Sequence, residues 1–476
     1  MGSQRRSMEP CLRAGGALGL ASASAVAVAV CGALPLWGQG PGSLPEAPPA
    51  LDARLYGVAA AASSGRVEAD IRTLAGFGTR NTFSDTISHT RGIGAARRWI
   101  KAEFDEISRA CGGCLEVSYQ RSRVLATESP RIPRDVDIVN VLAVLRGTVH
   151  PDRYVVMSGD IDSRPSDTTD GESDSPGAND NASGMAGTIE AARLLSEYRF
   201  PTSVVFAGLS GEEQGLWGGQ HMAAVAREEG WEIAAVLNND MIGNIEGIDG
   251  VIDNSTFRVF SEPTPLPDFQ SDSWSYRTNG GEVDGPSRQI ARYVDRIADL
   301  YFPNLDAMMI YRLDRFGRGG HHRPFNDAGF PAVRIMEAHE QYERQHQDVR
   351  VEDGIEYGDV IEGVDFRFAA TMSSLNATVL AALAWAPPAP ANVGIGGAVA
   401  PSTTLAWDPV DDPNVAGYRV YWRWTTDAQW RWSRWVGDVT EFTLENLVID
   451  NYLFGVATVG RDGNESVVSF PTSVLR

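Results

Sequence analysis

Acidic side chains recur at the ends of apolar runs in this sequence. The acids and their runs are Asp160 and Asp162 after residues 154–158, Glu212 and Glu213 after residues 203–209, and Asp240 within residues 234–242. Strands of a parallel sheet deliver such residues to one edge, because their carboxyl ends meet there. Carboxylates that arrive from several directions are the ligands that a binuclear metal site requires.

Two further residues extend this acidic set. Asp180 stands before a glycine-punctuated helix start in "SPGANDNASG", and His346 stands in "ERQHQDV". Each acid taken alone is explained equally well as a solvated turn residue or a helix cap. The ordered set instead favours a metal centre. There, the adjacent Glu212 and Glu213 point apart, so that one binds metal while the other holds the proton of a water molecule.

The elements that must position these residues alternate along the chain. Apolar periodicity predicts helices within residues 67–109, 183–198, 216–229 and 364–386, and strands over residues 137–145, 154–158, 203–209 and 234–242. This alternation predicts an α/β fold with a mixed, largely parallel sheet sandwiched by helices. A chain of 476 residues is long enough for one large and one small domain.

The ordered motifs "SGDIDS", "PGANDNASG", "SGEEQGLWG", "NDMIG" and "RQHQD" resemble those of the M28 family of zinc metallopeptidases. The resemblance implies a zinc-exopeptidase fold and two divalent metal ions, with Zn²⁺ favoured and Mn²⁺ as the alternative. It also implies that a metal-bound water hydrolyses a terminal peptide bond. By position, the implied roles are a bridge between the ions from Asp180, one ion completed by Asp160 and Asp240, the other by Glu213 and His346, a general base at Glu212, and a supporting catalytic role for Asp162.

The first motif departs from the family pattern, which has His-x-Asp where this chain has Asp160 and Asp162. An aspartate binds zinc at about 2.0–2.2 Å, so the change does not by itself abolish the site. It adds a carboxylate to the ligand set and therefore favours oxygen-preferring ions such as Mn²⁺. Asp162 loses the imidazole N–H that it would accept, so it must find Arg164 or a backbone donor, or be protonated.

The segment "RGGHHRPFNDAGF" resembles the family's Asp-His-x-x-Phe stretch near the substrate pocket, with His321 at the position of the aspartate. His321 or His322 is therefore a candidate ligand. A role in the pocket wall is favoured, because His346 already supplies an imidazole. Tyr342 is a further candidate for the pocket, although a surface position would explain it equally well.

The two ends of the chain differ in character from its middle. Residues 1–40 have the arginines and apolar run of a signal peptide, with a lipid anchor at Cys31 as the weaker alternative. Residues 41–386 form the predicted metallopeptidase domain, and residues 387–397 form a linker rich in proline and glycine. Residues 398–476 resemble a fibronectin type III domain, a small β-sandwich whose aromatic residues pack together or bind protein or carbohydrate.

The predicted export and the net charge indicate the state of the cysteines and the kinds of partner. Cys111 and Cys114 are predicted to form a local disulfide in a secreted or periplasmic protein. A net charge of −21 argues against a nucleic-acid partner and, after processing, against an anionic membrane surface. With the M28 resemblance, and because an acidic rim suits the α-amine of a substrate, we expect an exported aminopeptidase that acts on peptides. A carboxypeptidase of the same family and a catalytically degenerate binding protein are the alternatives.

Overall fold

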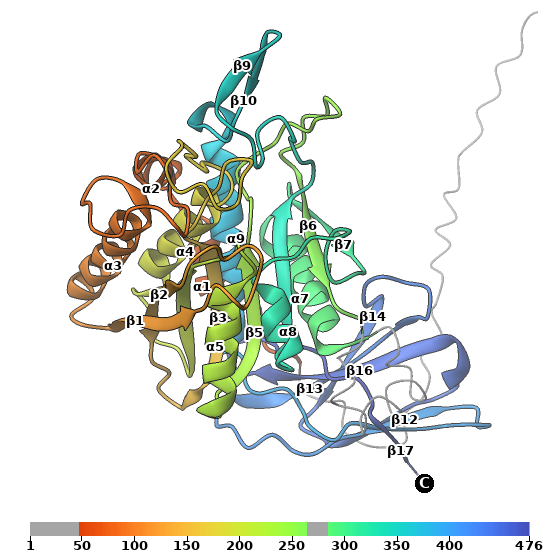
Figure 1. Ribbon diagram of the computed structural model, residues 1–476. Helices are drawn as coiled ribbons and strands as arrows, with labels where there is room; N and C mark the ends of the chain where they lie inside the picture. Colours follow the sequence, from red (N-terminus) through yellow and green to blue (C-terminus); the bar gives the residue numbers. More distant parts are fainter. Residues whose placement is uncertain (1–46, 264–283, 476) are drawn as a thin grey trace, which may run out of the picture. The chain divides into compact units, whose positions relative to one another are not determined.

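The computed structural model describes residues 47–263 and 284–475, so the predicted signal peptide lies outside the described residues. A mixed sheet of eight strands, in the order β1-β2-β4-β3-β5-β8-β6-β7, forms the centre of the described chain (Figure 1). The strands are β1 (Leu115–Val124), β2 (Val136–Leu145), β3 (His150–Asp160), β4 (Thr202–Leu209), β5 (Glu232–Asn239), β6 (Thr256–Ser261), β7 (Asp306–Ile310) and β8 (Ala332–Glu337).

The middle of this sheet is parallel. Strands β4, β3, β5 and β8 run in the same direction, whereas β2 joins β4 antiparallel and β6 joins β8 antiparallel. In this register Asp160 pairs with Leu209, and Gly159 pairs with Asn239. The residues that directly follow β3, β4 and β5 therefore leave the sheet at one edge, which confirms the predicted fold class.

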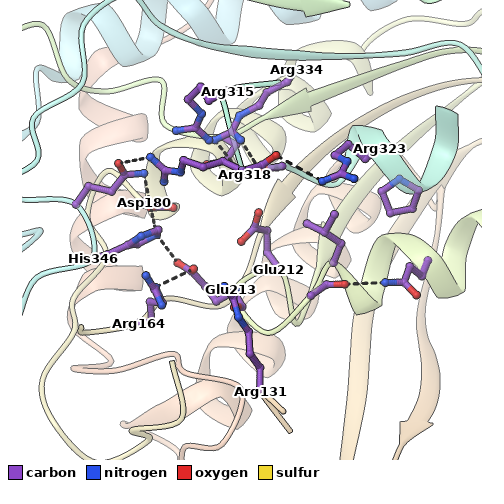
Figure 2. A pocket seen from close by; sticks show the side chains of 18 of the residues that line it. Arg131, Arg164, Asp180, Glu212, Glu213, Arg315, Arg318, Arg323, Arg334 and His346 are labelled. Atoms are coloured by element: carbon purple, nitrogen blue, oxygen red, sulfur yellow. Dashed lines mark hydrogen bonds and ion pairs between the residues drawn. The ribbon is translucent and has the colours of Figure 1, made fainter. Parts of the chain in front are cut away.

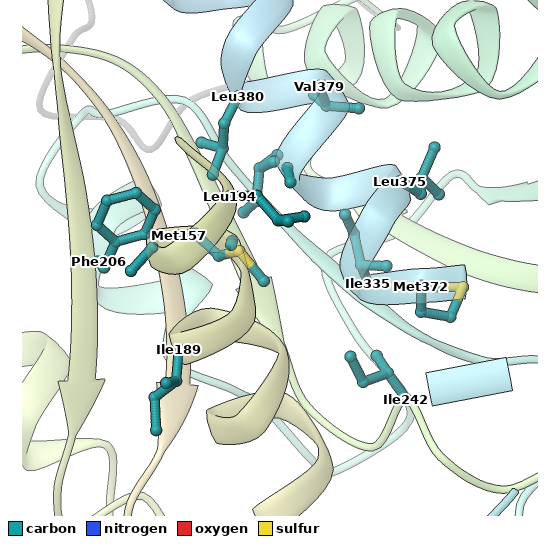
Figure 3. Packing of buried hydrophobic residues seen from close by; sticks show 14 of the residues in the cluster. Met157, Ile189, Leu194, Phe206, Ile242, Ile335, Met372, Leu375, Val379 and Leu380 are labelled. Carbon is teal, nitrogen blue, oxygen red and sulfur yellow. The ribbon is translucent and has the colours of Figure 1, made fainter. Parts of the chain in front are cut away.

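Helices cover both faces of the sheet. They are α1 (Ala53–Ala59), α2 (Ser64–Ala75), α3 (Gly92–Ala110), α4 (Ala182–Leu195), α5 (Trp217–Glu228), α7 (Pro286–Tyr301), α8 (His322–Asp327) and α9 (Phe366–Trp385). On β3 the side chains alternate, because successive residues of a strand point to opposite faces. Val155 and Met157 join the core cluster of α1–α4, α7 and α9, and Tyr154 and Val156 join the cluster of α5 and α8. Figure 3 shows part of the first cluster, where α9 packs beside α4.

Helix α9 is buried within this core. It is the one helix among the described residues whose length and composition would suffice to cross a bilayer, but 94% of its apolar window is buried inside the protein. It packs against α4, α1 and α2. We therefore describe α9 as a core helix.

Most predicted elements lie within a few residues of the observed ones, but the helical region 67–109 is two helices. Helix α2 ends at Ala75 with Gly76 as its C-cap, and α3 begins at Gly92. Gly78 and Gly92 have φ values of 77° and 84°, a left-handed conformation that favours glycine. These glycines let the chain turn between the helices. Helix α3 ends at the predicted disulfide, which Cys111 and Cys114 do form.

The C-terminal part is rich in sheet. A four-stranded sheet contains β11 (Gly394–Gly396), β12 (Thr403–Ala406), β15 (Glu441–Leu444) and β17 (Ser473–Val474), and a three-stranded sheet contains β13 (Val415–Trp424), β14 (Trp432–Gly437) and β16 (Tyr452–Gly460). Trp407 and Tyr418 belong to a core cluster there, and Trp424 stacks on Tyr452. The fibronectin type III resemblance and the domain boundaries remain predictions.

Candidate metal centre

The acids of the predicted site lie at the sheet edge where the parallel strands end. Asp160 is the last residue of β3, and Asp240 directly follows β5. Glu212 and Glu213 lie between β4 and α5, and Asp180 lies just before Asn181, the N-cap of α4. The strand ends thus bring together side chains from distant parts of the sequence, and Asp180, Glu212, Glu213 and Asp240 line one cavity.

Three of the predicted ligands converge closely. One ligand atom from each of Asp180, Glu213 and His346 lies within 4.8 Å of the others. His346 Nε2 is 3.0 Å from Asp180 Oδ2 and 3.2 Å from Glu213 Oε1. Two carboxylates and one imidazole form a donor set that suits Zn²⁺ in a site with an open position. We call these three residues the ligand trio.

The electrostatics of the ligand trio favour an ionised Asp180. Burial alone would raise the pKa of Asp180, but the hydrogen bond and charge of His346 hold it well below its usual range. Burial also opposes protonation of His346, yet the charges of Glu213 and Asp180 raise its pKa to about 9. A cation between these side chains would take the place of that imidazolium charge, because metal binding requires the neutral ring.

His346 adopts an unusual backbone conformation. Its φ is 57°, in the left-handed region that non-glycine residues enter at a cost of about 1–3 kcal/mol. Such conformations cluster at binding and catalytic sites, where the surrounding structure maintains them. This strain is consistent with a functional role for His346.

Neighbouring residues that the sequence did not assign to the ligand trio hold its carboxylates. Asp359 accepts the backbone N–H of Asp180 at 2.6 Å, and Gln345 Nε2 donates to Asp180 Oδ2 at 3.2 Å. Arg164 Nε lies 3.1 Å from Glu213 Oε2. Partners of this kind orient metal ligands. Gln345 belongs to the motif "RQHQD", so the sequence could have indicated it. Nothing near Asp359 in the sequence indicated the site.

Asp162 supports the loop of the two glutamates. Its carboxylate accepts the backbone N–H of Glu212 at 3.2 Å and that of Glu213 at 3.1 Å. Among the partners open to it in the sequence, Asp162 has therefore found backbone donors. Burial, together with the charges of Glu213 and Asp160, raises its pKa to about 6.

Glu212 faces the cavity beside the ligand trio. The cavity has a volume of about 570 Å³, and its lining includes Glu212, the ligand trio and Asp240. In the view of Figure 2, the Glu212 side chain lies between Glu213 and Arg318. Burial, followed by the charges of Glu213, Asp240, Asp160 and Asp180, raises the pKa of Glu212 well above its usual value. A carboxyl with a raised pKa beside a metal site is suited to exchange protons with a reacting water.

Asp160 and Asp240 lie near the ligand trio but bind protein groups. Asp160 Oδ1 is hydrogen bonded to His321 Nδ1 at 2.5 Å, and its Oδ2 accepts from Asn181 Nδ2 at 2.7 Å. Asp240 Oδ2 is 2.8 Å from Arg334 Nη2. Burial is the main cause that raises the pKa of each aspartate to about 8. We call Asp160 and Asp240 the paired aspartates.

The contact between Asp160 and His321 joins two departures from the family pattern. The pattern has histidine where this chain has Asp160, and aspartate where it has His321, so the two residue types have exchanged places. His321 is fully buried, and burial lowers its pKa to about 4. Its second ring nitrogen, Nε2, has no hydrogen-bond partner among the described residues.

The two other pocket candidates do not appear in the described lining of this cavity. His322 is buried, and its Nε2 is hydrogen bonded to the carbonyl of Leu313 at 2.8 Å. Tyr342 is 51% exposed. Both positions are compatible with a structural role.

The residues present fit one divalent ion and not a second. The ligand trio supplies three converging donors with an open side. In the described part of the chain, no second group of three potential ligand atoms lies within 4.8 Å of one another. A second ion beside Asp240 would also face the guanidinium of Arg334, and the two like charges would repel each other.

Comparisons with known proteins agree with this geometry. The sequence model of peptidase family M28 matches residues 140–357 of this chain. A probable zinc metalloprotease of Pyrenophora tritici-repentis is 36% identical over 430 residues, which cover 89% of this chain and 99% of the relative. One of Leptosphaeria maculans is 40% identical over 424 residues, with 89% and 98% covered.

A solved structure shares the fold. The crystal structure of LapA from Legionella pneumophila matches with a TM-score of 0.50 and 18% identity, over 70% of this chain and 76% of that one. At this identity the likeness shows the fold alone. Together, the family match, the long curated relatives and the ligand trio at the sheet edge show that this chain belongs to peptidase family M28.

Proposed function

We propose that the protein is a zinc-dependent exopeptidase. The observation that carries this proposal is the ligand trio beside Glu212, in one cavity at the carboxyl ends of the parallel strands. Zinc is supported by the donor types of the trio and by the relatives, whose names describe zinc metalloproteases. A degenerate binding protein would not need the cavity-facing Glu212 beside intact ligands.

The chain's own residues have separate tasks in this reaction. When bound, zinc supplies Lewis-acid chemistry, polarising the scissile carbonyl and lowering the pKa of water. Glu212 takes a proton from the attacking water and returns it to the leaving amine. Asp162 fixes the loop of Glu212 and Glu213 through two backbone hydrogen bonds, so that base and ligand keep their spacing.

The experiment that tests this function compares peptide hydrolysis before and after metal removal. We expect hydrolysis of short unblocked peptides to stop after dialysis against a chelator and to return with stoichiometric Zn²⁺. Peptides blocked at both termini should resist hydrolysis. Activity that persists without metal, or equal cleavage of doubly blocked peptides, would contradict a zinc exopeptidase.

The sequence favoured an aminopeptidase because its site is rimmed by acids, but the cavity also contains arginines. Arg164, Arg315, Arg318 and Arg334 are paired with carboxylates. Two further lining residues, Arg131 and Arg323, form no ion pair with any described carboxylate. Each of these two guanidinium groups donates to a backbone carbonyl, that of Glu213 or Arg318. A guanidinium group recognises a carboxylate by two parallel hydrogen bonds. This observation favours the carboxypeptidase as a second candidate function.

Matched peptide pairs separate the two directions. A carboxypeptidase should cleave amino-blocked peptides, and its KM should rise when the terminal carboxylate is amidated. Arg323→Met should then raise the KM of the free-acid substrate only. An aminopeptidase should cleave carboxyl-amidated peptides and be insensitive to Arg323→Met. The surface residue Arg227 provides a matched control, as Arg227→Met.

Export of the protein is also a proposal. The arginines and apolar run in residues 1–40 support a signal peptide. The Cys111–Cys114 disulfide supports an oxidising compartment, which is either the extracellular space or the periplasm. Mass analysis of secreted material would test both the removal of the signal peptide and the oxidation of Cys111 and Cys114.

A further inference from the structure

The paired aspartates differ from the ligand trio in what holds them. Asp240 Oδ2 lies 2.8 Å from Arg334 Nη2, and Arg334 Nη1 lies 3.2 Å from Asp314 Oδ2. Arg334 Nη1 also donates to the carbonyl of Gly319, and the residue is only 1% exposed. The guanidinium is thus fixed by carboxylates on two sides and a carbonyl, and it remains charged in the interior.

Asp160 is held by uncharged side chains. His321 and Asn181 each occupy one of its two oxygens, at 2.5 and 2.7 Å. Asn181 Nδ2 also donates to the carbonyl of Asn239, and Asn181 Oδ1 accepts the backbone N–H of Gly184 as the cap of α4. Asn181 is therefore fixed by several bonds and cannot turn away from Asp160 without breaking them.

These contacts leave no place for a second cation. A divalent ion there would need an oxygen each from Asp160 and Asp240, together with Oδ1 of Asp180, because Asp180 Oδ2 already faces His346. It would have to displace His321 or Asn181 from one aspartate and lie next to Arg334 at the other. At the ligand trio the competing protein groups are Gln345, which donates to Asp180 Oδ2 at 3.2 Å, and Arg164, which lies 3.1 Å from Glu213 Oε2, and neither is a guanidinium between two ligands.

We propose that this protein binds one catalytic divalent ion, at Asp180, Glu213 and His346, and that Arg334, His321 and Asn181 take the place of the second ion. Arg334 supplies a fixed positive charge where the second ion would lie, and it balances Asp240. His321 and Asn181 satisfy Asp160 by hydrogen bonds. The inference rests on the proposed function, because it assumes that the ligand trio binds metal.

The test counts bound zinc in the full chain. Wild-type protein is loaded with excess Zn²⁺, freed of loose metal by gel filtration, and measured by plasma mass spectrometry against protein concentration. We expect one zinc per chain. Two zinc ions per chain would overturn the inference while leaving the proposed function intact, and no bound zinc would overturn both.

Two matched aspartate variants assign the ion. Asp240→Asn keeps the shape of a paired aspartate and should still bind one zinc, whereas Asp180→Asn in the ligand trio should lower zinc affinity at least tenfold. Equal loss of zinc in both variants would make Asp240 a ligand and contradict the inference. Arg323→Met, which removes a cavity arginine that pairs with no described carboxylate, should leave the count at one.

A spectroscopic measurement on wild-type protein avoids any concern about folding of the variants. Mn²⁺ or Co²⁺ in excess should give the electron paramagnetic resonance signal of an isolated ion. Spin coupling between two neighbouring ions would contradict a one-ion site.

Discussion

The ligand trio and the paired aspartates lie at the same edge of the sheet, yet they differ in what neutralises their carboxylates. The trio presents its charges toward the cavity, and its closest cationic partner is His346, which is itself a ligand. Of the paired aspartates, Asp240 forms an ion pair with Arg334, and Asp160 is hydrogen bonded to His321 and Asn181 inside the protein. Acidic residues at strand ends therefore do not all become ligands. Whether a carboxylate is available to a metal ion depends on whether protein groups already bind it.

The largest effect should come from removing a member of the ligand trio. His346→Ala should abolish zinc binding and reduce turnover below detection, because two carboxylates alone no longer enclose the ion. Bound zinc and peptide hydrolysis are the measurements. His339→Ala, at a histidine paired with Asp249 outside the site, should change neither. Retained zinc in the His346 variant would erase the distinction between the trio and the paired aspartates.

The next effect separates proton transfer from metal binding. Glu212→Gln preserves shape but cannot accept a proton, so kcat should fall about 10²- to 10⁴-fold while zinc remains stoichiometric. Steady-state kinetics and metal analysis on the same sample provide the check. The exposed Glu228 on α5 gives a control, because Glu228→Gln should be neutral. Near wild-type kcat in the Glu212 variant would remove that residue from the mechanism.

A smaller effect is expected at Asp162, which acts through the glutamate loop. Asp162→Asn presents an amide N–H₂ or a single oxygen to two backbone N–H donors, so the loop should lose one hydrogen bond. We expect a loss of about 10- to 100-fold in zinc affinity or kcat/KM, typical of groups that orient ligands. Zinc titration alongside kinetics would show it. If KM, kcat and zinc affinity were all unchanged, the conformation of the glutamate loop would not depend on Asp162.

The smallest change in turnover should accompany a change in metal count. Exchanging the pair, as Asp160→His with His321→Asp, returns an imidazole to the end of β3 and an acid behind it. Zinc per chain should rise only part of the way from one toward two, because Arg334 still lies beside Asp240. The change in kcat should be less than about tenfold, because the ligand trio is untouched. The single variant Asp160→His is the comparison. A count that stays at one would show that the Asp160–His321 pair is not what closes the second position.

The sequence predicted the elements and the edge of the site because both depend on local patterns. The runs before Asp160, Glu212 and Asp240 are apolar and short, and parallel pairing of β4, β3 and β5 makes their ends coincide. The ligand trio was within the predicted set because the motifs that contain its members resemble those of family M28. Local patterns also identified the disulfide, since Cys111 and Cys114 are only three residues apart.

The partners of the acids could not be predicted in this way. Arg334 lies in the middle of β8, where nothing in "AVRIME" distinguishes a core strand with a buried ion pair from an amphipathic one. Asp359 and Arg164 reach the site from loops. The exchange between Asp160 and His321 appeared as two unrelated departures, because only the fold brings residues 161 positions apart into contact.

The hydrogen bonds around Asp180 also have a consequence in time. Gln345 and Asp359, which hold Asp180, follow it by 165 and 179 residues. At a synthesis rate of about 5–20 residues per second, the chain waits roughly 8 to 36 s after Asp180 is made before these partners exist. His346 is made in the same late interval. A nascent chain therefore cannot complete its ion site until most of the domain has been translated, and hydrolytic activity begins only once synthesis of the fold is nearly finished.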